Sequence, residues 1–323
     1  MSLPASDQNA VADQRITMQL GDVLPKTAEV KDGHLYIGGV DMVQLAREQG
    51  TALYVFDEED LRDRIAQYRD DLAAAYPNSE VIYASKAFLN KAMARIAAEE
   101  GISLDVSGGG ELAIALAAGF PASRVYVHGN NKTEVELAEA IDAGVGRIML
   151  DSRIELERVN RLAGERGVVQ DVYMRITPGV EADTHEYIKT GCEDSKFGFT
   201  MREDWAFNCV EDVLAAPNVR LAGVHMHIGS QIFALHSFDE AIEVAIDLFA
   251  RIRERYNHVI EELDIGGGVG VAYMVDDKPC TIAEFAQLAA DSVRKHCAAH
   301  DFPEPRILCE PGRSSAAPAG VTL

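Results

Sequence analysis

The amino-acid sequence predicts an α/β fold, an eight-stranded (β/α)8 TIM-like barrel. Eight short apolar segments alternate with amphipathic helical segments between residues 81 and 309 of the 323-residue chain. Strict alternation of this kind predicts a parallel sheet covered by helices, and eight such units in this length fit a closed barrel. A doubly wound open sheet is the alternative, but it usually has fewer strands.

Polar residues and glycines follow nearly every predicted strand, which is the third observation. In such barrels the chemistry takes place at the carboxyl ends of the strands, so we expect a functional site there. The predicted strands cover residues 81–84, 103–106, 124–127, 147–150, 171–176, 221–227, 261–265 and 306–309. The predicted helices between them cover residues 91–100, 110–118, 133–143, 153–165, 239–255 and 281–299.

The composition is acidic and excludes two classes of partner. The formal net charge is −22, whereas nucleic acid and anionic membrane surfaces both need clustered cations. Solvated acidic helix faces explain this charge, and a high-salt proteome is the second explanation. No segment has the length and apolarity of a membrane span. The five cysteines indicate neither a disulfide framework nor a zinc site, which favours a cytoplasmic location; they are Cys192, Cys209, Cys280, Cys297 and Cys309.

The segments on either side of the predicted barrel are short. Residues 1–24 carry no secretory signal and are expected to form a disordered tail. Residues 33–56 indicate two short strands flanking a helix, and Asp57 is expected to cap the helix that follows. The barrel itself is expected to span residues 58–313. Residues 314–323 are small and apolar and resemble the first strand of a further unit.

One predicted strand ends on a lysine, Lys86, within the otherwise uncharged segment VIYASKAF (81–88). A strand of this composition is expected to be buried on both faces, and a buried ammonium is costly unless it is neutralised or used covalently. Lysines in such settings serve as Schiff-base nucleophiles. The alternative is a lysine at a strand end whose amine simply reaches solvent.

The glycine triplet Gly266, Gly267 and Gly268 after the seventh strand is a candidate phosphate site. Its backbone N–H groups are expected to be unhindered, and the loops after strands seven and eight of such barrels frequently bind phosphate. Glycine triplets are also common as plain turns. Ser230 and Arg313, at neighbouring strand ends, would complete an anion site with a hydroxyl and a cation.

A phosphate site together with a strand-end lysine suggests pyridoxal 5'-phosphate (PLP) as the cofactor. Its pyridine nitrogen stays protonated only beside an anion, which Glu310 is placed to supply; an ion pair with Arg313 is the alternative role of Glu310. His227 is the candidate for a flat contact with the ring. His225 faces the same side of the strand, but no third ligand of suitable spacing supports a metal site at these histidines.

Eight segments carry a more specific resemblance. In order and approximate spacing they resemble the diaminopimelate decarboxylase family, a branch of the fold-type III PLP-dependent decarboxylases, from about residue 33 to the last residue. Ornithine and arginine decarboxylases and alanine racemase share the barrel and the lysine, but the HMHIGSQ and THEYI segments match the diaminopimelate branch. The eight segments are YASKAF (83–88), LDVSGGGEL (104–112), HGNNK (128–132), THEYI (184–188), KFG (196–198), HMHIGSQ (225–231), DIGGG (264–268) and EPGR (310–313).

The resemblance implies a barrel of the alanine racemase type and a set of site residues. Lys86 would carry PLP, His227 would stack on its ring, and Glu310 would pair with the pyridine nitrogen. Arg313 would hold the phosphate and contact the substrate. The other residues implied near the cofactor are Asp105, Glu111, Arg175, Ser230, Gly266, Gly267, Gly268, Pro311 and Gly312.

The resemblance also implies a reaction, the decarboxylation of meso-2,6-diaminopimelate to L-lysine and carbon dioxide, the last step of lysine biosynthesis. In the family a β-rich domain follows the barrel, supplies the proton-donor cysteine in a CESGD string, and completes the site across a homodimer. This sequence ends before such a string, so we expect a fragment with impaired activity rather than a naturally short protein. Residues 25–57 would belong partly to that domain, and residues 314–323 would begin it.

Three other functions stay open from the sequence. Another PLP-dependent amino-acid decarboxylase or a racemase fits the same barrel. A non-catalytic barrel that binds partners is the second, although Lys86, Glu310 and the glycine triplet together argue against it. The third is a lyase that uses Lys86 on a sugar phosphate without any cofactor.

Overall fold

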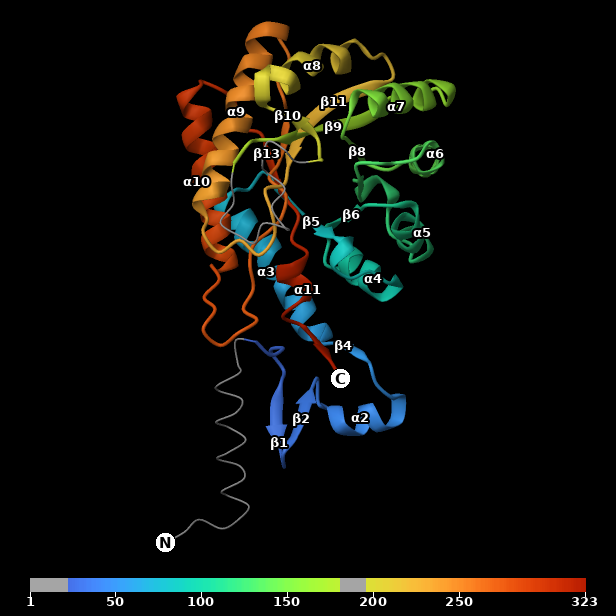
Figure 1. Cartoon of the computed structure of the whole chain (residues 1–323), viewed down its shortest axis with the longest axis vertical. Coiled ribbons are helices and arrows are strands. Elements are labelled where there is room, and N and C mark those ends of the chain that lie inside the picture. Colours follow the sequence, from blue (N-terminus) through green and yellow to red (C-terminus); the bar gives the residue numbers. More distant parts are fainter. Residues whose placement is uncertain (1–22, 181–195) are drawn as a thin grey trace.

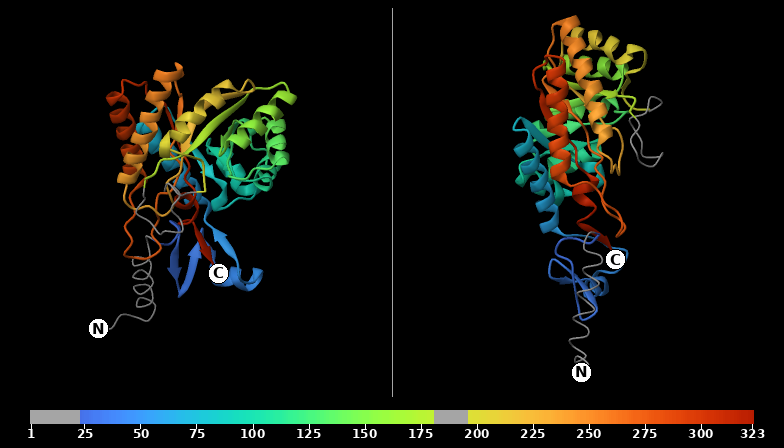
Figure 2. Two further views of the ribbon diagram at one scale, coloured as in Figure 1. Left: turned by 45° about the horizontal axis from the view of Figure 1, so that its top comes forward. Right: turned by 90° about the vertical axis from the view of Figure 1, so that its left-hand side faces the viewer.

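The computed structural model describes residues 23–180 and 196–323, and a closed barrel of eight parallel strands lies at its centre (Figures 1 and 2). The strands pair in the order β9, β11, β12, β13, β5, β6, β7, β8, and β8 pairs with β9 to close the ring. The predicted barrel is confirmed, with strand ends shifted by at most two residues. The strands are β5 (Ser79–Ala84), β6 (Ser103–Val106), β7 (Val125–Val127), β8 (Arg147–Leu150), β9 (Gln170–Thr177), β11 (Val219–Met226), β12 (Glu262–Asp264) and β13 (Arg306–Cys309). A ninth strand, β10 (Phe199–Thr200), pairs with β9 outside the ring.

Helices surround the barrel, and side-chain caps fix where several of them begin (Figure 1). The Asp57 carboxylate accepts the N–H groups of Glu59 and Asp60 at the start of α3, as predicted. Thr133 and Thr281 each form a capping box at the start of α6 and α10. The sequence analysis missed α8. The helices are α3 (Glu58–Ala75), α4 (Lys91–Glu99), α5 (Gly109–Ala117), α6 (Glu134–Ala143), α7 (Arg153–Glu165), α8 (Trp205–Ala215), α9 (His236–Tyr256) and α10 (Ile282–Ala299).

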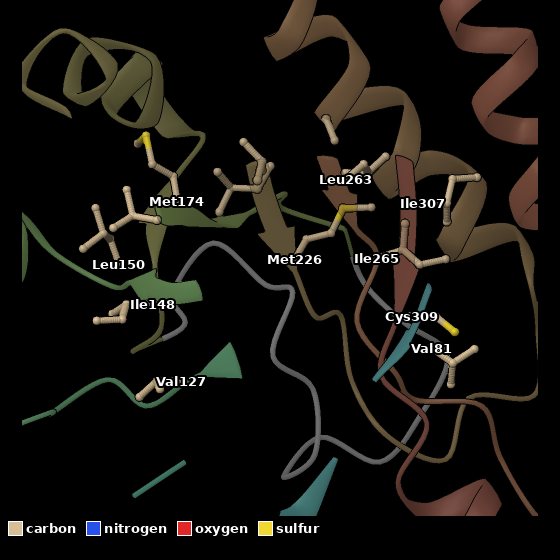
Figure 3. Close-up of a cluster of buried hydrophobic side chains, with 14 of the residues drawn as sticks. Val81, Val127, Ile148, Leu150, Met174, Met226, Leu263, Ile265, Ile307 and Cys309 are labelled. Carbon is tan, nitrogen blue, oxygen red and sulfur yellow. The ribbon is translucent and has the colours of Figure 1, made fainter. Parts of the chain in front are cut away.

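Apolar strand side chains pack in one buried cluster with the covering helices. Figure 3 shows part of this cluster, including Val81, Ile148, Leu263 and Ile307. Phe285 of α10 belongs to the same cluster. A parallel strand that is buried on both faces needs apolar residues at successive positions, which is why these strands could be recognised in the sequence.

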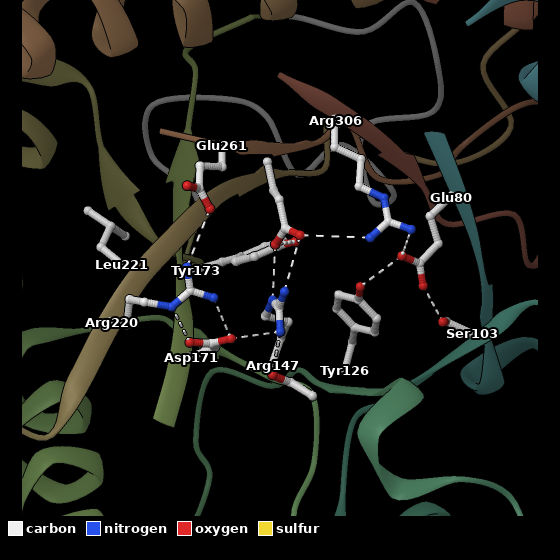
Figure 4. Close-up of polar contacts among 12 residues, drawn as sticks. Glu80, Ser103, Tyr126, Arg147, Asp171, Tyr173, Arg220, Leu221, Glu261 and Arg306 are labelled. Atoms are coloured by element: carbon white, nitrogen blue, oxygen red, sulfur yellow. Dashed lines mark hydrogen bonds and ion pairs between the residues drawn. The ribbon is translucent and has the colours of Figure 1, made fainter. Parts of the chain in front are cut away.

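Side chains inside the barrel form layers along its axis. At the strand starts lies a network of charges, named here the strand-start network (Figure 4). In it Arg147 contacts Asp171 at 2.9 Å and Glu262 at 3.0 Å, and Arg306 contacts Glu80 at 2.7 Å. The candidate site lies at the opposite end of the strands. Between the two lies a buried cluster, named here the apolar layer, which consists of Ile82, Tyr126, Met149, Tyr173, Ala222 and Leu308.

A small group of strands with one helix lies at one end of the molecule (Figure 1). The helix predicted within residues 33–56 and the strands on either side of it are confirmed, but two strands rather than one precede the helix in this range, and a further strand lies before the range. These elements are β1 (Glu29–Lys31), β2 (His34–Ile37), β3 (Val40–Asp41), α2 (Met42–Gln49) and β4 (Tyr54–Phe56).

The residues after the barrel return to this group. They form a short helix, α11 (Arg313–Ala316), and then a strand, β14 (Gly320–Thr322). β14 pairs antiparallel with β4, a contact that the sequence analysis did not foresee. The domain boundaries proposed from the sequence stay predictions.

Some predictions fall outside the described residues, namely most of the tail, the THEYI segment (184–188) and Cys192. The remaining cysteines, Cys209, Cys280, Cys297 and Cys309, are free thiols. None of the helices in the described ranges combines the length and the apolarity that crossing a bilayer requires.

Candidate active site

The carboxyl ends of the barrel strands border a cavity of about 660 Å³. A second cavity of about 330 Å³ lies against it, because Lys86, His227 and Glu310 line both. These three residues come from the ends of three different strands, so the fold brings together the residues predicted as the lysine, the ring contact and the anion. Ser230, Gly268, Gly312 and Arg313 also line the larger cavity, and Arg175 lines the smaller one.

Lys86 lies two residues beyond the end of the strand on which the sequence suggested it. β5 ends at Ala84, and Lys86 sits in the short 3-10 turn that follows it, η1 (Ser85–Ala87). Its side chain is exposed rather than buried. Of the two alternatives left open from the sequence, a buried amine and an amine that reaches solvent, the structure shows the second, because the turn places Lys86 outside the sheet. The side chain nevertheless lines both cavities, where a nucleophilic amine is useful.

The glycine triplet is a place of close backbone approach. A Cβ on Gly267 would lie 2.1 Å from the carbonyl oxygen of Glu310, and a Cβ on Gly268 would lie 2.4 Å from that of Gly229. Side chains cannot fit at such distances, so these positions require glycine for packing. Gly267 thereby sets the backbone position of Glu310.

Two of the triplet's backbone N–H groups are already engaged within the protein. The Gly266 N–H donates to the Asp264 carboxylate at 2.9 Å, and the Gly267 N–H donates to Nδ1 of His227 at 3.3 Å. The expectation of three unhindered N–H groups was therefore wrong. Gly268 is the member of the triplet that lines the larger cavity.

Arg313 and Ser230 meet at the rim of the larger cavity, as predicted. Nε of Arg313 donates to Oγ of Ser230 at 3.0 Å, and Nη1 donates to the hydroxyl of Tyr273 at 2.6 Å. Among the described residues, these contacts take the place of the Arg313–Glu310 ion pair considered from the sequence. Pro311 and Gly312 form the short connection that carries Arg313 from β13 to this rim.

Glu310 is buried and has two histidines beside it. Nε2 of His128 lies 2.7 Å from Oε1, and Nε2 of His225 lies 3.3 Å from Oε2. Ligating atoms of His128, His225, Asp264 and Glu310 all lie within 4.8 Å of one another. The statement that His225 lacks further ligating neighbours was therefore wrong, because the fold supplies them from other strands. The expectation of a site without metal stays a prediction.

Burial and the charges of neighbouring groups shift the pKa values of these buried carboxyl and imidazole groups in different directions. Burial raises the pKa of Asp105 to about 6, and burial together with Glu310 raises the pKa of Asp264 well above its ordinary value. Burial lowers the pKa of His225 to about 3. Burial also opposes ionisation of Glu310, but the contacts with His128 and His225 outweigh it and hold the pKa of Glu310 well below its ordinary value.

Three residues that the resemblance placed near the cofactor have different surroundings. Arg175 is buried beside the smaller cavity, with its guanidinium 4.3 Å from the centroid of the Phe197 ring. Asp105 is fully buried, and neither of its carboxylate oxygens has a hydrogen-bond partner among the described residues. Glu111 accepts the N–H of Ser107 at 2.6 Å, so it supports the loop after β6.

Sequence reasoning assigned no role to His128, Asp264 or Tyr273. His128 and Asp264 each follow an inward-facing strand residue, Tyr126 and Glu262, by two positions, and period-two geometry places both inside the barrel. That signal was present in the sequence. Tyr273 lies on the long loop after β12, where no such periodicity applies.

Among the described residues, the buried lysine is Lys132. Nζ of Lys132 donates to the carbonyl oxygens of Gly129 at 2.6 Å and Met149 at 2.7 Å, and it lies 3.0 Å from the Glu155 carboxylate. These contacts fix the loop that begins at His128. Lys132 therefore holds the loop after β7 against the end of β8.

The site fits the PLP cofactor that the resemblance implies. An amine, an imidazole and a carboxylate line one cavity with an arginine–serine pair. Beneath it, several buried polar atoms have no hydrogen-bond partner among the described residues: both carboxylate oxygens of Asp105, Nε2 of His128, Nδ1 of His225, Oδ2 of Asp264 and Oε1 of Glu310. Orphaned buried polar atoms are rare in folded proteins and are typical of a functional site.

Comparison with protein families gives a match over most of the barrel. The model described as "Pyridoxal-dependent decarboxylase, pyridoxal binding domain" matches residues 59–317. The diaminopimelate decarboxylase of Bacillus subtilis is 44% identical over 291 residues, which cover 90% of this chain and 66% of the relative. That of Mycobacterium tuberculosis is 44% identical over 295 residues, covering 90% and 65%. The chain thus spans about 65% of the length of these curated relatives.

Solved structures agree with the sequence relatives. The diaminopimelate decarboxylase of M. jannaschii superposes with a TM-score of 0.84 at 33% identity, covering 94% of this chain and 69% of that one. The enzyme of Helicobacter pylori complexed with L-lysine gives a TM-score of 0.78 at 26% identity, with 87% and 68% covered. A lysine/ornithine decarboxylase of Vibrio vulnificus gives 0.71 at 25% identity, with 87% and 69% covered.

Proposed function

Because the chain belongs to the pyridoxal-dependent decarboxylases, in their diaminopimelate decarboxylase branch, we propose that it acts on meso-2,6-diaminopimelate and releases L-lysine and carbon dioxide. The observation that carries this proposal is the convergence of Lys86, His227 and Glu310 on one cavity. An amine nucleophile, a flat imidazole and a buried carboxylate are the groups that PLP-dependent chemistry requires.

Different residues of this chain would have different roles in the reaction. PLP, when bound, supplies an electron sink for the electrons that remain as the carboxyl group departs. The Lys86 amine would serve as the nucleophile that holds the cofactor. Glu310, kept ionised by its contacts, would supply the anion that holds a proton on the ring nitrogen of the cofactor. Burial lowers the pKa of His227 well below its ordinary value, so a neutral imidazole is offered to the ring.

The rim residues would bind anions. Arg313 supplies a guanidinium fixed by Ser230 and Tyr273, and Gly268 leaves room for a ligand to approach the backbone. A guanidinium that is already oriented loses less entropy on binding a phosphate or a carboxylate. A homodimer and a cytoplasmic location are further parts of the proposal; the homodimer rests on the resemblance, and the location rests on the cysteine pattern.

Release of labelled carbon dioxide from carboxyl-labelled meso-diaminopimelate tests the proposal. The assay uses the purified 323-residue chain, loaded with PLP and present in excess over the substrate, so that a single slow turnover is detected. We expect labelled carbon dioxide and an equal amount of L-lysine from the wild type, together with a visible absorbance band from bound PLP. Lys86→Ala is expected to lose the band and at least about 1,000-fold of the rate, because its nucleophile is absent.

Lys91→Ala is the matched control, since it removes a lysine from the exposed start of α4 a few residues away. It is expected to keep both the band and the rate. Preferential turnover of ornithine or arginine would assign the chain to another branch of the family. PLP binding without any decarboxylation would leave a binding protein, and the absence of binding would refute the proposal. The same assay measures the weak turnover that the sequence analysis expects.

A further inference from the structure

Three buried carboxyl groups meet at the strand ends beneath the cavities. Asp105 lies within β6, Asp264 is the last residue of β12, and Glu310 directly follows β13. Glu310 raises the pKa of both aspartic acids, and Asp105 raises the pKa of Asp264, so these interacting buried carboxyls are not all ionised together. The cationic or titratable groups that face this cluster from the other elements are Lys86, His128, Arg175, His225 and His227.

Polar partners are distributed unequally among these three carboxyls. Nε2 of His128 lies 2.7 Å from one oxygen of Glu310, at ion-pair distance but without hydrogen-bond geometry, and Nε2 of His225 hydrogen-bonds the other oxygen at 3.3 Å. Asp264 receives one backbone N–H, from Gly266, and its second oxygen has no partner within the described ranges. Asp105 has none there on either oxygen. Donors stabilise the charged form of the group that accepts from them, so the charge belongs on Glu310.

The two histidines are themselves held in place. The His128 N–H donates to the carbonyl oxygen of Val106 at 2.7 Å, and Lys132 fixes the following loop through the Gly129 carbonyl. His225 lies within β11, and its ring meets that of His128 edge to face at 4.7 Å between centroids. Glu310 therefore has two firmly positioned imidazoles beside it, while its side chain still lines both cavities.

We propose that His128 and His225 act together as positioning residues that keep the negative charge of this cluster on Glu310, while Asp105 and Asp264 retain protons. The inference rests on the proposed function, because it matters most when Glu310 faces the ring nitrogen of PLP. Without the histidines, a proton would move from an aspartic acid to Glu310. The ring nitrogen would then lose the anion that holds its proton.

Infrared spectroscopy of the cofactor-free chain, labelled isotopically at its glutamates, tests where the proton lies. We expect no protonated-carboxyl band from Glu310 in the wild type. Such a band is expected to appear in the His128→Phe/His225→Phe double variant and to vanish when Glu310→Gln is added. The last step identifies the band, because other buried glutamates such as Glu155 stay unchanged in all three proteins.

Cofactor binding gives the second measurement. We expect each single histidine-to-phenylalanine variant to weaken PLP binding about 10- to 100-fold, the usual effect of losing a hydrogen bond to a charged group. Binding of 1-deazapyridoxal 5'-phosphate, which has carbon in place of the ring nitrogen, is expected to change by less than about twofold. The His225→Gln variant is expected to recover PLP binding, because its amide can donate where Nε2 did.

His34→Phe is the matched control, since His34 also contacts a carboxylate, Asp41 at 2.8 Å, but far from the barrel cavities. Thermal unfolding shows that each variant is folded before it is compared. Equal losses for PLP and its deaza analogue would overturn the inference, as would a protonated Glu310 band in the wild type. The inference would also be overturned if the purified wild-type chain contained one zinc ion per chain and the histidine variants contained none. If the wild-type chain binds PLP but does not decarboxylate the substrate, the proposed function is refuted and the inference about the histidines is not. If the wild-type chain binds no PLP, the infrared measurement decides the role of the histidines.

Discussion

At the scale of single residues, the two lysines near the site have opposite environments. Lys86 is exposed and lines the cavities, whereas Lys132 is buried against Glu155 and two carbonyl oxygens. Burial lowers the pKa of Lys132, and burial likewise raises that of Glu155, so neither charge is favourable without the other. Among the described residues, Lys86 thus makes no ion pair of the kind that holds a structural lysine in place.

Breaking the Lys132–Glu155 pair should destabilise the fold. Lys132→Met leaves the Glu155 carboxylate buried without its cation and leaves two carbonyl oxygens without a donor. We expect the free energy of unfolding to fall by about 3–5 kcal/mol in urea denaturation. The double variant Lys132→Met/Glu155→Leu should recover more than half of this loss, because no isolated charge is left. A double variant as unstable as the single one would show that the carbonyl contacts dominate.

A methyl group on Gly267 should displace Glu310. The Cβ of Gly267→Ala would meet the Glu310 carbonyl oxygen at 2.1 Å, so the backbone must move. We expect a loss of about 2–3 kcal/mol in the free energy of unfolding, measured in urea, together with weaker PLP binding. Gly110→Ala is the control, since no atom lies within 4 Å of its Cβ position and alanine favours the helix. An unchanged Gly267→Ala protein would contradict the close packing of the triplet.

Single residues also show how far the sequence could be interpreted. Lys86, His227 and Glu310 were identified because each is chemically unusual for its place at a strand end. The partners of Glu310 were not, because they come from other strands: Asp264 from the neighbouring β12, and His128 from the end of β7, three strands away in the sheet. The free N–H groups expected of the glycine triplet depended on neighbours, Asp264 and His227, that local sequence does not reveal.

At the scale of elements, the barrel strands were predictable and their partners were less so. Burial on both faces makes each strand an apolar run, and capping residues mark α3, α6 and α10. Helix α8 begins after Asp204, a residue type that favours N-caps, but here its backbone is left-handed and its side chain makes no capping bond. The strands β4 and β14 precede and follow the barrel in the sequence, and they pair with each other in the structure. Local periodicity carries no information about such a long-range contact.

The contact between α9 and α10 should make stability depend on pH. Asp239 of α9 accepts from His296 at 2.9 Å and lies 3.0 Å from the Lys295 amine. Burial opposes its ionisation, but hydrogen bonds from Ser292, His296 and Lys295 outweigh this and lower the pKa of Asp239 to about 2. A carboxyl with a depressed pKa stabilises the fold above its unfolded pKa, and this contribution is lost as the pH falls toward the folded value.

Asp239→Asn removes that contribution. We expect the variant to be less stable than the wild type by about 1–2 kcal/mol near pH 7, measured in urea. The difference should shrink between pH 4 and pH 2, because protonation of Asp239 then destabilises the wild type as well. Asp247→Asn, on the same helix at an exposed position, is the control and should show no such pH dependence. A constant difference across this range would argue against the hydrogen-bonded carboxylate.

At the scale of the whole molecule, the strand-start network ties the closed end of the barrel together. Arg147 from β8 reaches Asp171 on β9 and Glu262 on β12, and thus spans the interior (Figure 4). Residues from strands far apart in the sequence are joined by these contacts. The network lies at the end opposite to the cavities, so its expected effect is on stability rather than on the chemistry.

Arg147→Met should therefore lower the free energy of unfolding without changing the reaction. We expect a loss of about 2–4 kcal/mol in urea, because two largely buried carboxylates lose their partner. Affinity for PLP should stay within about twofold of the wild-type value. Arg161→Met is the control, since its ion pairs are exposed and are expected to contribute less than about 0.5 kcal/mol. Weakened PLP binding in Arg147→Met would show that the two ends are coupled.

The apolar layer decides how protons can travel in this barrel. Its aliphatic and thioether side chains offer no relay, and the hydroxyls of Tyr126 and Tyr173 bond to Glu80 and Glu262 on the strand-start side. Through the described interior, then, no hydrogen-bonded wire joins the two ends. We therefore expect the acids around Glu310 to exchange protons with bulk water by way of the cavities, and a ligand bound there to slow that exchange.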